Sequence, residues 1–507
     1  MLALHIENII KYYGDRLILN IPDFKIYSGD RIGLIGTNGC GKTTLLDIIT
    51  GKTKPDEGDV HITGKWAYIT QLENTGIADY LSGGEITKAK IFDAVSGNPN
   101  FLIGDEPTAN LDVDGIKKTE SMFKRMKGSL LIVSHDRAFL DNLCNKIIKL
   151  ENGILTEYQG NYSSYSKQAE LERLTRQNEY EKYRTEKKHL EDAVSGMARA
   201  EQRIKKTPTR MGNSEARLHK RSSTAIKKHL AQHRKGMQTR LDKLAVKEKP
   251  VDPRTLTIYH QGISLPVSKT ALELDIPVLS AGDKRLVEDI EIRIPTGAKI
   301  ALSGPNGSGK TTLLNHIKGN QHGVRLAPGS RTAFFSQKLD DIDDDISLLD
   351  NILAESTLKQ SMVRTVLASM LFTKADIFKK AGLLSGGERV KLQLAKALLS
   401  GADMLLLDEA TNYLDIMAID ALELLMNKFP GTILFVSHDR RLVENTADRI
   451  YEIRKNRIID ATYESQVDDR TDAVMLMTEI RLSELAAYMT RGDVSDEDLA
   501  AAQAEYD

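Results

Sequence analysis

Long hydrophobic runs, cysteine and aromatic residues are all scarce in this chain of 507 residues. No apolar run approaches the roughly 18 residues that suggest a membrane span, so we expect no transport channel and no membrane contact. The first residues lack the basic start of a secretory signal. The two cysteines, Cys40 and Cys144, cannot form a framework of disulfides, which favours a reducing compartment. We therefore expect a cytoplasmic protein.

Charge is balanced over the whole chain, at a net −1, but not along it. Residues 196–250 hold 16 Lys and Arg against 4 Asp and Glu, a local net charge of +12. A polyanion would bind there. Residues 463–507 show the reverse, with 12 Asp and Glu against 3 Arg, and indicate a solvated acidic tail.

The chain repeats itself at fixed spacing. An offset of 303 residues relates Ser82 to Ser385, Asp105 to Asp408, and His135 to His438. Upstream the offset falls to 268 for Lys42 and Lys310, and to 266 for Gln71 and Gln337. The two halves are therefore copies of one fold, and the first half is 37 residues shorter between Gln71 and Ser82.

Apolar patterns place the repeated motifs on a parallel sheet. Short apolar strands that start at Arg31 and Lys299 run into glycine-rich turns and then into helices. The runs that start at Phe101, Met404 and Ile433 are apolar throughout, as in strands buried on both faces. Each half is thus predicted to be an α/β domain.

The segment between the halves has a helical pattern. Residues 163–207 contain no proline and only Gly196, which predicts a long helix with a narrow apolar seam. The seam consists of Leu171, Leu174, Leu190, Val194 and Met197. A second helix is expected from about Ser222 to Val246, with Pro208 to Arg221 as the turn. The result is a long α-helical hairpin arm with its tip near residues 208–221.

Two glycine-rich segments match the phosphate-binding loop, and each stands between a predicted strand and a helix. Glycines let backbone N–H groups wrap the phosphates at a helix N-terminus, the lysine holds the β and γ phosphates, and the threonine can ligate Mg²⁺. One such match can arise by chance, but two matches followed by the same later motifs do not. The predicted nucleotide-binding residues are Gly36, Asn38, Gly39, Gly41, Lys42, Thr43 and Thr44, and Gly304, Asn306, Gly307, Gly309, Lys310, Thr311 and Thr312.

Paired carboxylates end the second apolar strand of each half. Asp105 and Asp408, together with Thr43 and Thr311, are predicted to hold Mg²⁺. The next residues, Glu106 and Glu409, are placed to orient or deprotonate an attacking water. Gln71 and Gln337 would couple the metal to domain movement, and His135 and His438 would contact the γ phosphate. A lone His or Gln is more often structural, so these four gain weight only from the surrounding set.

The set as a whole resembles the ATP-binding cassette superfamily: two phosphate loops, two LSGGE signatures, DEPTANLD and DEATNYLD, and two VSHDR motifs. The resemblance implies an ATPase with two tandem cassettes of the ABC type that forms ADP and phosphate. It also implies a monomer whose cassettes pair within the chain, each signature closing over the nucleotide held by the other cassette. ATP at Lys42 would then face Ser385, Gly386 and Gly387, and ATP at Lys310 would face Ser82, Gly83 and Gly84.

The aromatic residue that stacks on adenine in this superfamily is matched by Tyr13, whereas the parallel position in the second half holds Ala281. The second site would then lack a stacking contact. Tyr13 also has an alternative interpretation as a packing residue, because an aromatic pair such as Tyr12 and Tyr13 suits a buried edge.

Three kinds of cassette protein compete for the chain. A transporter ATPase normally keeps the full segment between glutamine and signature, which the first half lacks, and a chromosome or DNA-repair ATPase carries far longer coiled coils. The ABC-F family of ribosome-associated ATPases resembles the chain best, because its members join two cassettes by a helical linker. The tyrosine-rich segment from Tyr158 to Tyr165 resembles the start of that linker. The implied domains are 1–160 and 251–462 for the cassettes, 161–250 for the basic arm and 463–507 for the acidic tail.

Resemblance to ABC-F implies that the arm binds the ribosome. A basic helical arm suits ribosomal RNA, although a solvated charged helix is the plain alternative. The predicted RNA-binding residues are Arg199, Arg203, Lys205, Lys206, Arg210, Lys220, Arg221, Lys227 and Lys228.

The shortened first cassette and the linker sequence from Lys206 to Lys220 resemble the Vga/Lsa-type antibiotic-resistance branch of ABC-F. That resemblance implies entry into the exit site of the 70S ribosome, contact with 23S rRNA and peptidyl-tRNA, and displacement of lincosamides, pleuromutilins and streptogramin A. A housekeeping ABC-F translation factor that acts on stalled ribosomes remains the alternative.

Overall fold

The computed structural model divides the chain into two compact units, Met1–Tyr162 with Pro253–Asp507, and Ser163–Asp252. The first unit contains two halves, residues 2–162 and 268–462, and the second unit is the arm. The structure describes residues 2–70, 83–203, 213–247, 268–336, 342–356, 358–370, 372–412 and 414–462, with the backbone alone for 213–224 and 369.

Within the described residues, the first half has a six-stranded sheet in the order β5-β6-β7-β3-β8-β9 and a three-stranded sheet in the order β2-β1-β4. The large sheet is parallel except for β9, which pairs antiparallel with β8. The strands are β1 (Leu2–Tyr13), β2 (Arg16–Tyr27), β3 (Arg31–Ile35), β4 (Glu57–Ile62), β5 (Trp66–Ile69), β6 (Phe101–Asp105), β7 (Ser129–Val133), β8 (Lys146–Glu151) and β9 (Ile154–Gln159). The helices are α1 (Lys42–Ile49), α2 (Gly83–Ser96), α3 (Val113–Arg125) and α4 (Arg137–Leu143).

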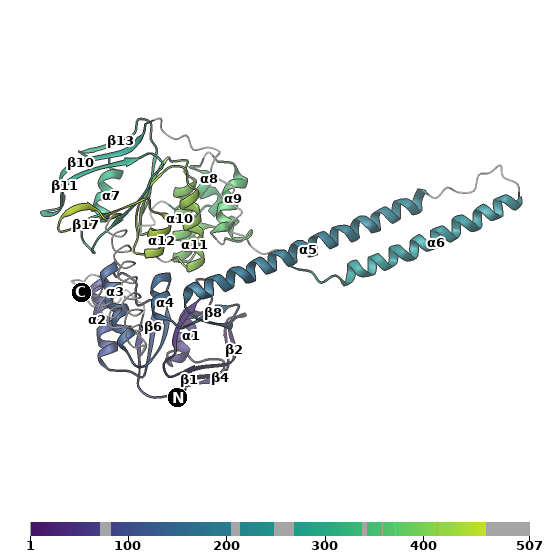
Figure 1. The fold of residues 1–507 in the computed structure, drawn as a ribbon, viewed down its shortest axis with the longest axis horizontal. Helices are drawn as coiled ribbons and strands as arrows, with labels where there is room; N and C mark the ends of the chain where they lie inside the picture. Colours follow the sequence, from purple (N-terminus) through teal and green to yellow (C-terminus); the bar gives the residue numbers. More distant parts are fainter. Residues whose placement is uncertain are drawn as a thin grey trace, which may run out of the picture. The chain divides into compact units, whose positions relative to one another are not determined.

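In the part of the chain that the structure describes, the second half repeats this topology with orders β14-β15-β16-β12-β17-β18 and β11-β10-β13. Helix α7 lies beside β10 and β11 in Figure 1, and apolar residues of the three elements belong to one core. The strands are β10 (Thr270–Ala281), β11 (Lys284–Pro295), β12 (Lys299–Ser303), β13 (Val324–Leu326), β14 (Thr332–Phe335), β15 (Met404–Asp408), β16 (Thr432–Val436), β17 (Arg449–Arg454) and β18 (Arg457–Asp460). The helices are α7 (Lys310–Lys318), α8 (Leu348–Leu353), α9 (Gln360–Ser369), η1 (Asp376–Phe378), η2 (Ala381–Leu383), α10 (Gly386–Leu399), α11 (Ile416–Lys428) and α12 (Arg440–Thr446).

The predicted α/β fold with two sheet-based nucleotide-binding domains is confirmed. Every residue of β6, β7, β15 and β16 is buried, as their continuous apolar sequences predict. Because β6, β7 and β3 are parallel neighbours, the segments that follow them leave the same edge of the sheet. In the first half the phosphate loop follows β3, the paired carboxylates stand at the end of β6, and the histidine follows β7.

Extra helices fill the longer segment of the second half. Helices α8 and α9 bury Leu348, Ile352 and Val366 against α10, and these residues join one core. In the first half Phe92 of α2 is largely exposed, whereas its counterpart in the second half, Ala395, is buried. The shortened segment thus corresponds to a smaller helical layer.

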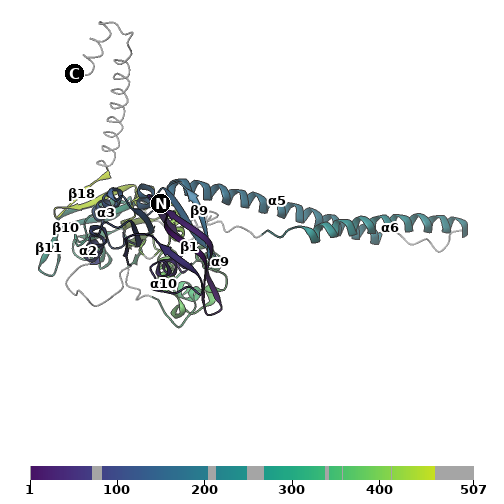
Figure 2. The same cartoon turned by 90° about the horizontal axis from the view of Figure 1, so that it is seen from below.

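The arm consists of α5 (Tyr162–Arg203) and α6 (Asn213–Lys243). The two helices lie side by side and run in opposite directions in Figure 1, and they stay aligned in the turned view of Figure 2. An ion pair from Glu201 to Arg234 links the two helices, and Glu179 of α5 pairs with Lys247, which follows the end of α6. At 1.5 Å per residue, the 42 residues of α5 extend about 63 Å.

The predicted start of the second arm helix, near Ser222, is wrong, since α6 begins at Asn213. Asn213 and Ser214 are favoured at helix N-termini, and Ala216, Arg217 and Leu218 are strong helix formers. Residues 204–212, like the acidic tail 463–507, lie outside the described residues. The domain limits at 160, 250 and 462 stay predictions. Among the described helices, none is long and apolar enough to cross a membrane.

Candidate functional site: two ATP sites between the halves

Each phosphate loop wraps its lysine. Gly41 and Gly309 precede α1 and α7 with φ of 106° and 108°, a left-handed conformation that favours glycine. A Cβ at Gly41 would lie 2.8 Å from Cγ2 of Ile18, so there is also no room for a side chain at this position.

The buried lysines lie over their own loops. Nζ of Lys42 donates to the carbonyl oxygens of Gly36 at 2.8 Å and Thr37 at 3.1 Å. Lys310 donates to Gly304 at 2.7 Å and Pro305 at 2.9 Å. A phosphate in the loop would share these donors, as the predicted role requires. The other loop residues, including Asn38, Gly39, Thr44, Asn306, Gly307 and Thr312, lie in the same two turns and first helical residues.

The predicted metal ligands meet in both halves. Oγ1 of Thr43 donates to Oδ2 of Asp105 at 3.1 Å, and Thr311 forms the corresponding hydrogen bond with Asp408. Burial raises the pKa of both aspartates. Oδ1 of Asp408 is buried without a hydrogen-bond partner among the described residues. Hydroxyl and carboxylate oxygens are the ligands that Mg²⁺ prefers, so these residues fit that ion.

A strained glutamate and a buried histidine face each other in each half. Glu106 and Glu409 have φ of 51° and 50°, which side-chain-bearing residues rarely adopt. Nε2 of His135 lies 3.2 Å from Oε1 of Glu106, and Nε2 of His438 lies 3.0 Å from Oε1 of Glu409.

Burial controls the protonation of these pairs. It raises the pKa of Glu106 to about 8, with Asp105 adding to the effect, and that of Glu409 to about 7. Burial lowers the pKa of His135 to about 3 and that of His438 to about 4, so both imidazoles are neutral at pH 7. A carboxylate whose pKa lies near the working pH is suited to general-base catalysis.

One cavity of about 1930 Å³ is lined by motifs from both halves. Asn38 and Gly39 line it together with Ser385 and Gly387 from the opposite half. The other phosphate loop approaches the first signature closely, because a Cβ at Gly84 would lie 3.3 Å from Nδ2 of Asn306.

The structure therefore brings each phosphate loop to the signature of the other half. The lining residues are Asn38, Gly39, Gly83, Gly84, Glu106, His135, Asn306, Gly307, Gly309, Lys310, Thr311, Thr312, Ser385, Gly387, Asp408, Glu409 and His438, with others. Gln71, Ser82 and Gln337 lie outside the described residues. The nucleotide contacts of all these residues stay predictions.

Ser385 has a structural role that the sequence pattern did not reveal. It caps α10, and its hydroxyl also bonds Oε2 of Glu388 at 2.7 Å. Glu388 accepts in turn from the backbone N–H of Ser385 at 2.8 Å. This capping box accounts for the glutamate that ends the signature. Gly386 faces open space.

Two aspartates that bridge the halves were missed from the sequence. Oδ2 of Asp415 accepts the N–H of Asn38 at 3.1 Å, and Oδ2 of Asp112 accepts that of Asn306 at 3.4 Å. Both aspartates also cap helices, α11 and α3. The sequence did contain evidence for these two aspartates, because they end the repeated DEPTANLD and DEATNYLD motifs at an offset of 303.

Strand register shows that Tyr13 and Ala281 are equivalent positions. Tyr13 pairs with Arg16 at the end of one hairpin, and Ala281 pairs with Lys284 at the end of the other. The side chain of Tyr13 is 55% exposed, which contradicts the alternative of a buried packing residue. Arg16, Ala281 and Lys284 line the cavity.

Comparison with known proteins decides the family. The family described as "ABC transporter" matches residues 19–75 and 287–412. The chain is 34% identical over 476 residues to the erythromycin resistance ATP-binding protein MsrA of Staphylococcus epidermidis, covering 88% of this chain and 96% of that protein. The chain belongs to the ABC-F family of tandem ATP-binding cassette ATPases.

Two further likenesses agree with ABC-F membership. The ribosome protection protein VmlR of Bacillus subtilis (strain 168) is 30% identical over 489 residues, covering 92% of this chain and 88% of VmlR. A solved structure titled RNase-L Inhibitor has a TM-score of 0.59 at 19% identity, covering 89% of this chain and 90% of that one, and shares the fold. As an ABC-F ATPase, the chain binds and hydrolyses ATP.

Proposed function

We propose that this ABC-F ATPase binds the ribosome and protects it from antibiotics that act near the peptidyl-transferase centre. The observation that carries the proposal is the likeness, over most of the chain, to MsrA and VmlR, whose names state erythromycin resistance and ribosome protection. The drugs expected from the linker sequence are lincosamides, pleuromutilins and streptogramin A.

The arm supports a ribosomal RNA partner. Arg199 and Arg203 are exposed near the end of α5, and Lys228 is exposed on α6, with Lys227 partly exposed beside it. These residues belong to the segment that carries a net +12. Phosphates attract such a surface, and 23S rRNA and the transfer RNA in the exit site are the polyanions near the proposed drug sites. Lys205, Lys206 and Arg210 lie outside the described residues, as do the side chains of Lys220 and Arg221.

At each ATP site the residues have distinct proposed tasks. Glu106 and Glu409 take the proton of the attacking water, while neutral His135 and His438 can donate Nε2–H toward the γ phosphate. Mg²⁺ held by Thr43 and Asp105, or by Thr311 and Asp408, would neutralise phosphate charge. The signature glycines complete the phosphate cage only when the halves close, so hydrolysis is coupled to movement of the halves.

Drug susceptibility tests the proposal. Expression of the wild-type chain in a susceptible bacterium should raise the inhibitory concentrations of the three drug classes, with erythromycin included because MsrA is named for it. Drugs that act away from the peptidyl-transferase centre serve as the control. If no ribosome-targeting drug loses potency while the protein still pellets with ribosomes, the housekeeping translation factor is the better account.

Ribosome binding is tested separately through the arm. Neutralising Arg199, Arg203, Lys227 and Lys228 together should weaken co-sedimentation with 70S ribosomes and flatten its salt dependence by about one unit of slope per lost phosphate contact. ATP hydrolysis without ribosomes should stay as in the wild type. Unchanged binding with an unchanged salt slope would exclude the arm as the ribosome-binding element.

A further inference from the structure

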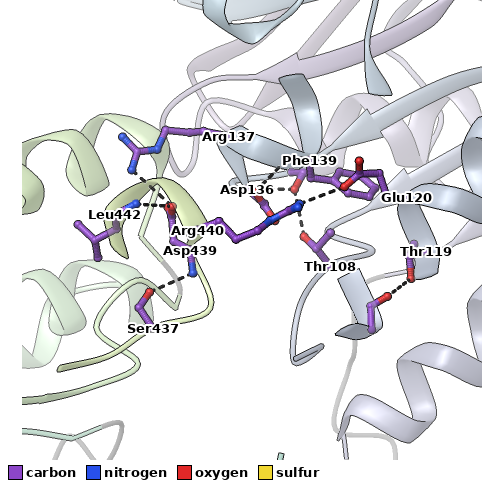
Figure 3. A network of polar contacts seen from close by, with 12 residues as sticks. Thr108, Thr119, Glu120, Asp136, Arg137, Phe139, Ser437, Asp439, Arg440 and Leu442 are labelled. Carbon is purple, nitrogen blue, oxygen red and sulfur yellow. Dashed lines mark hydrogen bonds and ion pairs between the residues drawn. The ribbon is translucent and has the colours of Figure 1, made fainter. Parts of the chain in front are cut away.

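The two VSHDR motifs place an arginine directly behind each catalytic histidine. Arg137 and Arg440 are the first residues of α4 and α12, two positions after His135 and His438. Figure 3 shows that each arginine extends from its own half toward carboxylates of the other half. No nucleotide motif assigns a role to either arginine.

Arg137 is buried against three carboxylates from the second half, of which Glu423 and Asp439 are largely buried and Asp420 is half-exposed. Nη1 lies 2.7 Å from Oδ1 of Asp420 and 2.8 Å from Oε2 of Glu423. Nη2 lies 3.5 Å from Oδ1 of Asp439, which caps α12. The arginine side chain is only 5% exposed, and the surrounding carboxylates raise its pKa although burial opposes this.

Arg440 makes the reciprocal contacts with the first half. Its Nη2 lies 3.1 Å from Oε2 of Glu120 and 4.0 Å from Oδ2 of Asp136, which caps α4 (Figure 3). The side chain of Arg440 is 18% exposed. Glu120 and Asp136 are the counterparts of Glu423 and Asp439 at an offset of 303.

The two clusters differ by one charge. Asp420 contributes a third carboxylate to Arg137, whereas the equivalent position in the first half is Lys117, which is exposed. Arg137 itself is thus more buried than Arg440 and has one more carboxylate beside it, and this third carboxylate, Asp420, is 54% exposed.

Hydrogen bonds link the backbone of each capping aspartate to residues that neighbour the histidine–glutamate pair in sequence. The N–H of Asp136 donates to Oγ of Ser134 at 3.1 Å, and that hydroxyl bonds Oγ1 of Thr108 at 3.1 Å. Thr108 follows Glu106 by two residues, and His135 stands between Ser134 and Asp136. The second half repeats the chain through Asp439, Ser437 and Thr411 at 3.0 and 3.1 Å. The aspartate that lies beside the opposite arginine therefore belongs to the same hydrogen-bonded segment as the histidine.

We propose that Arg137 and Arg440 are positioning residues that hold the two halves in the closed arrangement and set the histidine–glutamate pairs, with Arg137 the stronger of the two. Removing one partner of a buried charge pair leaves the other charges uncompensated in low dielectric. The penalty falls on the closed state, because separated halves expose these groups to water. The inference rests on the ATPase activity and is independent of the ribosome.

Closure of the halves can be titrated with ATP in a chain that does not hydrolyse it. The background is Glu106→Gln with Glu409→Gln, and the readout is energy transfer between a dye on each half, without ribosomes. Arg137→Met should raise the ATP concentration for half-closure by about tenfold or more, and Arg440→Met by about threefold. Methionine keeps the apolar stem, and Arg137→Lys should recover most of the loss.

Matched variants separate positioning from folding. Arg454→Ala removes an arginine that pairs with Glu452 of its own half, and it should leave closure unchanged. Lys117→Asp should give Arg440 a third carboxylate and lower the ATP concentration for half-closure. Asp420→Lys should raise the ATP concentration for half-closure. If Arg137→Met closes at the same ATP concentration as Arg454→Ala, or if Arg440→Met has the larger effect, the proposal is overturned.

If Arg137→Met fails to fold, the double-mutant cycle of Arg137→Gln with Glu423→Gln decides instead. Coupled residues should give a combined effect on half-closure clearly smaller than the product of the two single effects. A combined effect on half-closure equal to the product of the two single effects would overturn the proposed pairing of Arg137 with Glu423.

Discussion

The proposed ATP site at Lys42 and the proposed ATP site at Lys310 carry the same motif residues but are built differently around them. At the Lys42 site, Asp415 pairs with Lys391 at 3.1 Å, and both side chains are buried. At the Lys310 site, Asp112 and Lys88 are 3.9 Å apart, and Lys88 is 51% exposed.

Two further features also differ between the Lys42 site and the Lys310 site. Asp415 holds the opposite phosphate loop at 3.1 Å and Asp112 at 3.4 Å. The first half has Tyr13 where the second has Ala281. Repetition of the motifs thus preserves the chemistry, while residues beside the motifs make the Lys42 site the more tightly assembled of the two. One prediction tests the shared chemistry, and three test the difference between the two sites.

The largest effect should come from the shared chemistry. Glu106→Gln with Glu409→Gln removes both proposed general bases and should reduce ATP hydrolysis by about 10²- to 10⁴-fold while ATP binding persists. Steady-state phosphate release and equilibrium binding of ATP are the measurements. Turnover at the wild-type rate in the double variant would exclude these glutamates as catalytic.

The next largest effect should distinguish the two lysines. Lys391→Met leaves the buried carboxylate of Asp415 without its cation and should destabilise the fold by about 3 kcal/mol. Lys88→Met, at an exposed pair, should cost less than about 1 kcal/mol. Denaturant unfolding of the two variants measures both values. Equal losses would remove the difference in assembly that we infer from the two pairs.

A smaller effect is expected at the adenine position. Tyr13→Ala should weaken ATP binding at the Lys42 site by about 1 to 3 kcal/mol if the exposed ring stacks on the base. Ala281→Tyr should strengthen the Lys310 site. Tyr27→Ala, an exposed tyrosine on β2, is the control. Affinities that neither substitution moves would exclude stacking as a source of the difference.

The smallest effect is a difference in pH dependence. With Glu409→Gln only Glu106 acts, and its pKa of about 8 places the fall of kcat/KM on acidification near pH 8. With Glu106→Gln, the pKa of Glu409, about 7, places the fall near pH 7. The direction follows because a protonated carboxylate cannot accept the proton of water. Coincident profiles, or rates that rise on acidification, would contradict this assignment.

Local patterns predicted the strands, the phosphate loops and the paired carboxylates, because each motif occupies a short continuous segment. Glu106 illustrates this, since an apolar strand and a preceding aspartate are enough to place it. The partners of Arg137 could not be predicted in this way, as Asp420 and Glu423 lie more than 280 residues away. The common offset of 303 nevertheless relates Glu423 to Glu120, whereas Asp420 corresponds to Lys117 and has no acidic counterpart.

The start of the second arm helix shows a different limit of prediction from the sequence. The predicted break at Pro208 and Gly212 falls on residues outside those that the structure describes, but the return helix begins at Asn213 instead of near Ser222. Helix ends depend on capping and tertiary contacts that the apolar periodicity does not record.

Equilibrium binding of ATP to the Glu106→Gln, Glu409→Gln protein, followed by calorimetry, tests the inequality of the sites most directly. Two classes of site are expected, with the tighter class lost on Lys42→Ala and the weaker class lost on Lys310→Ala. Two sites of equal affinity, reduced alike by either lysine substitution, would contradict the account.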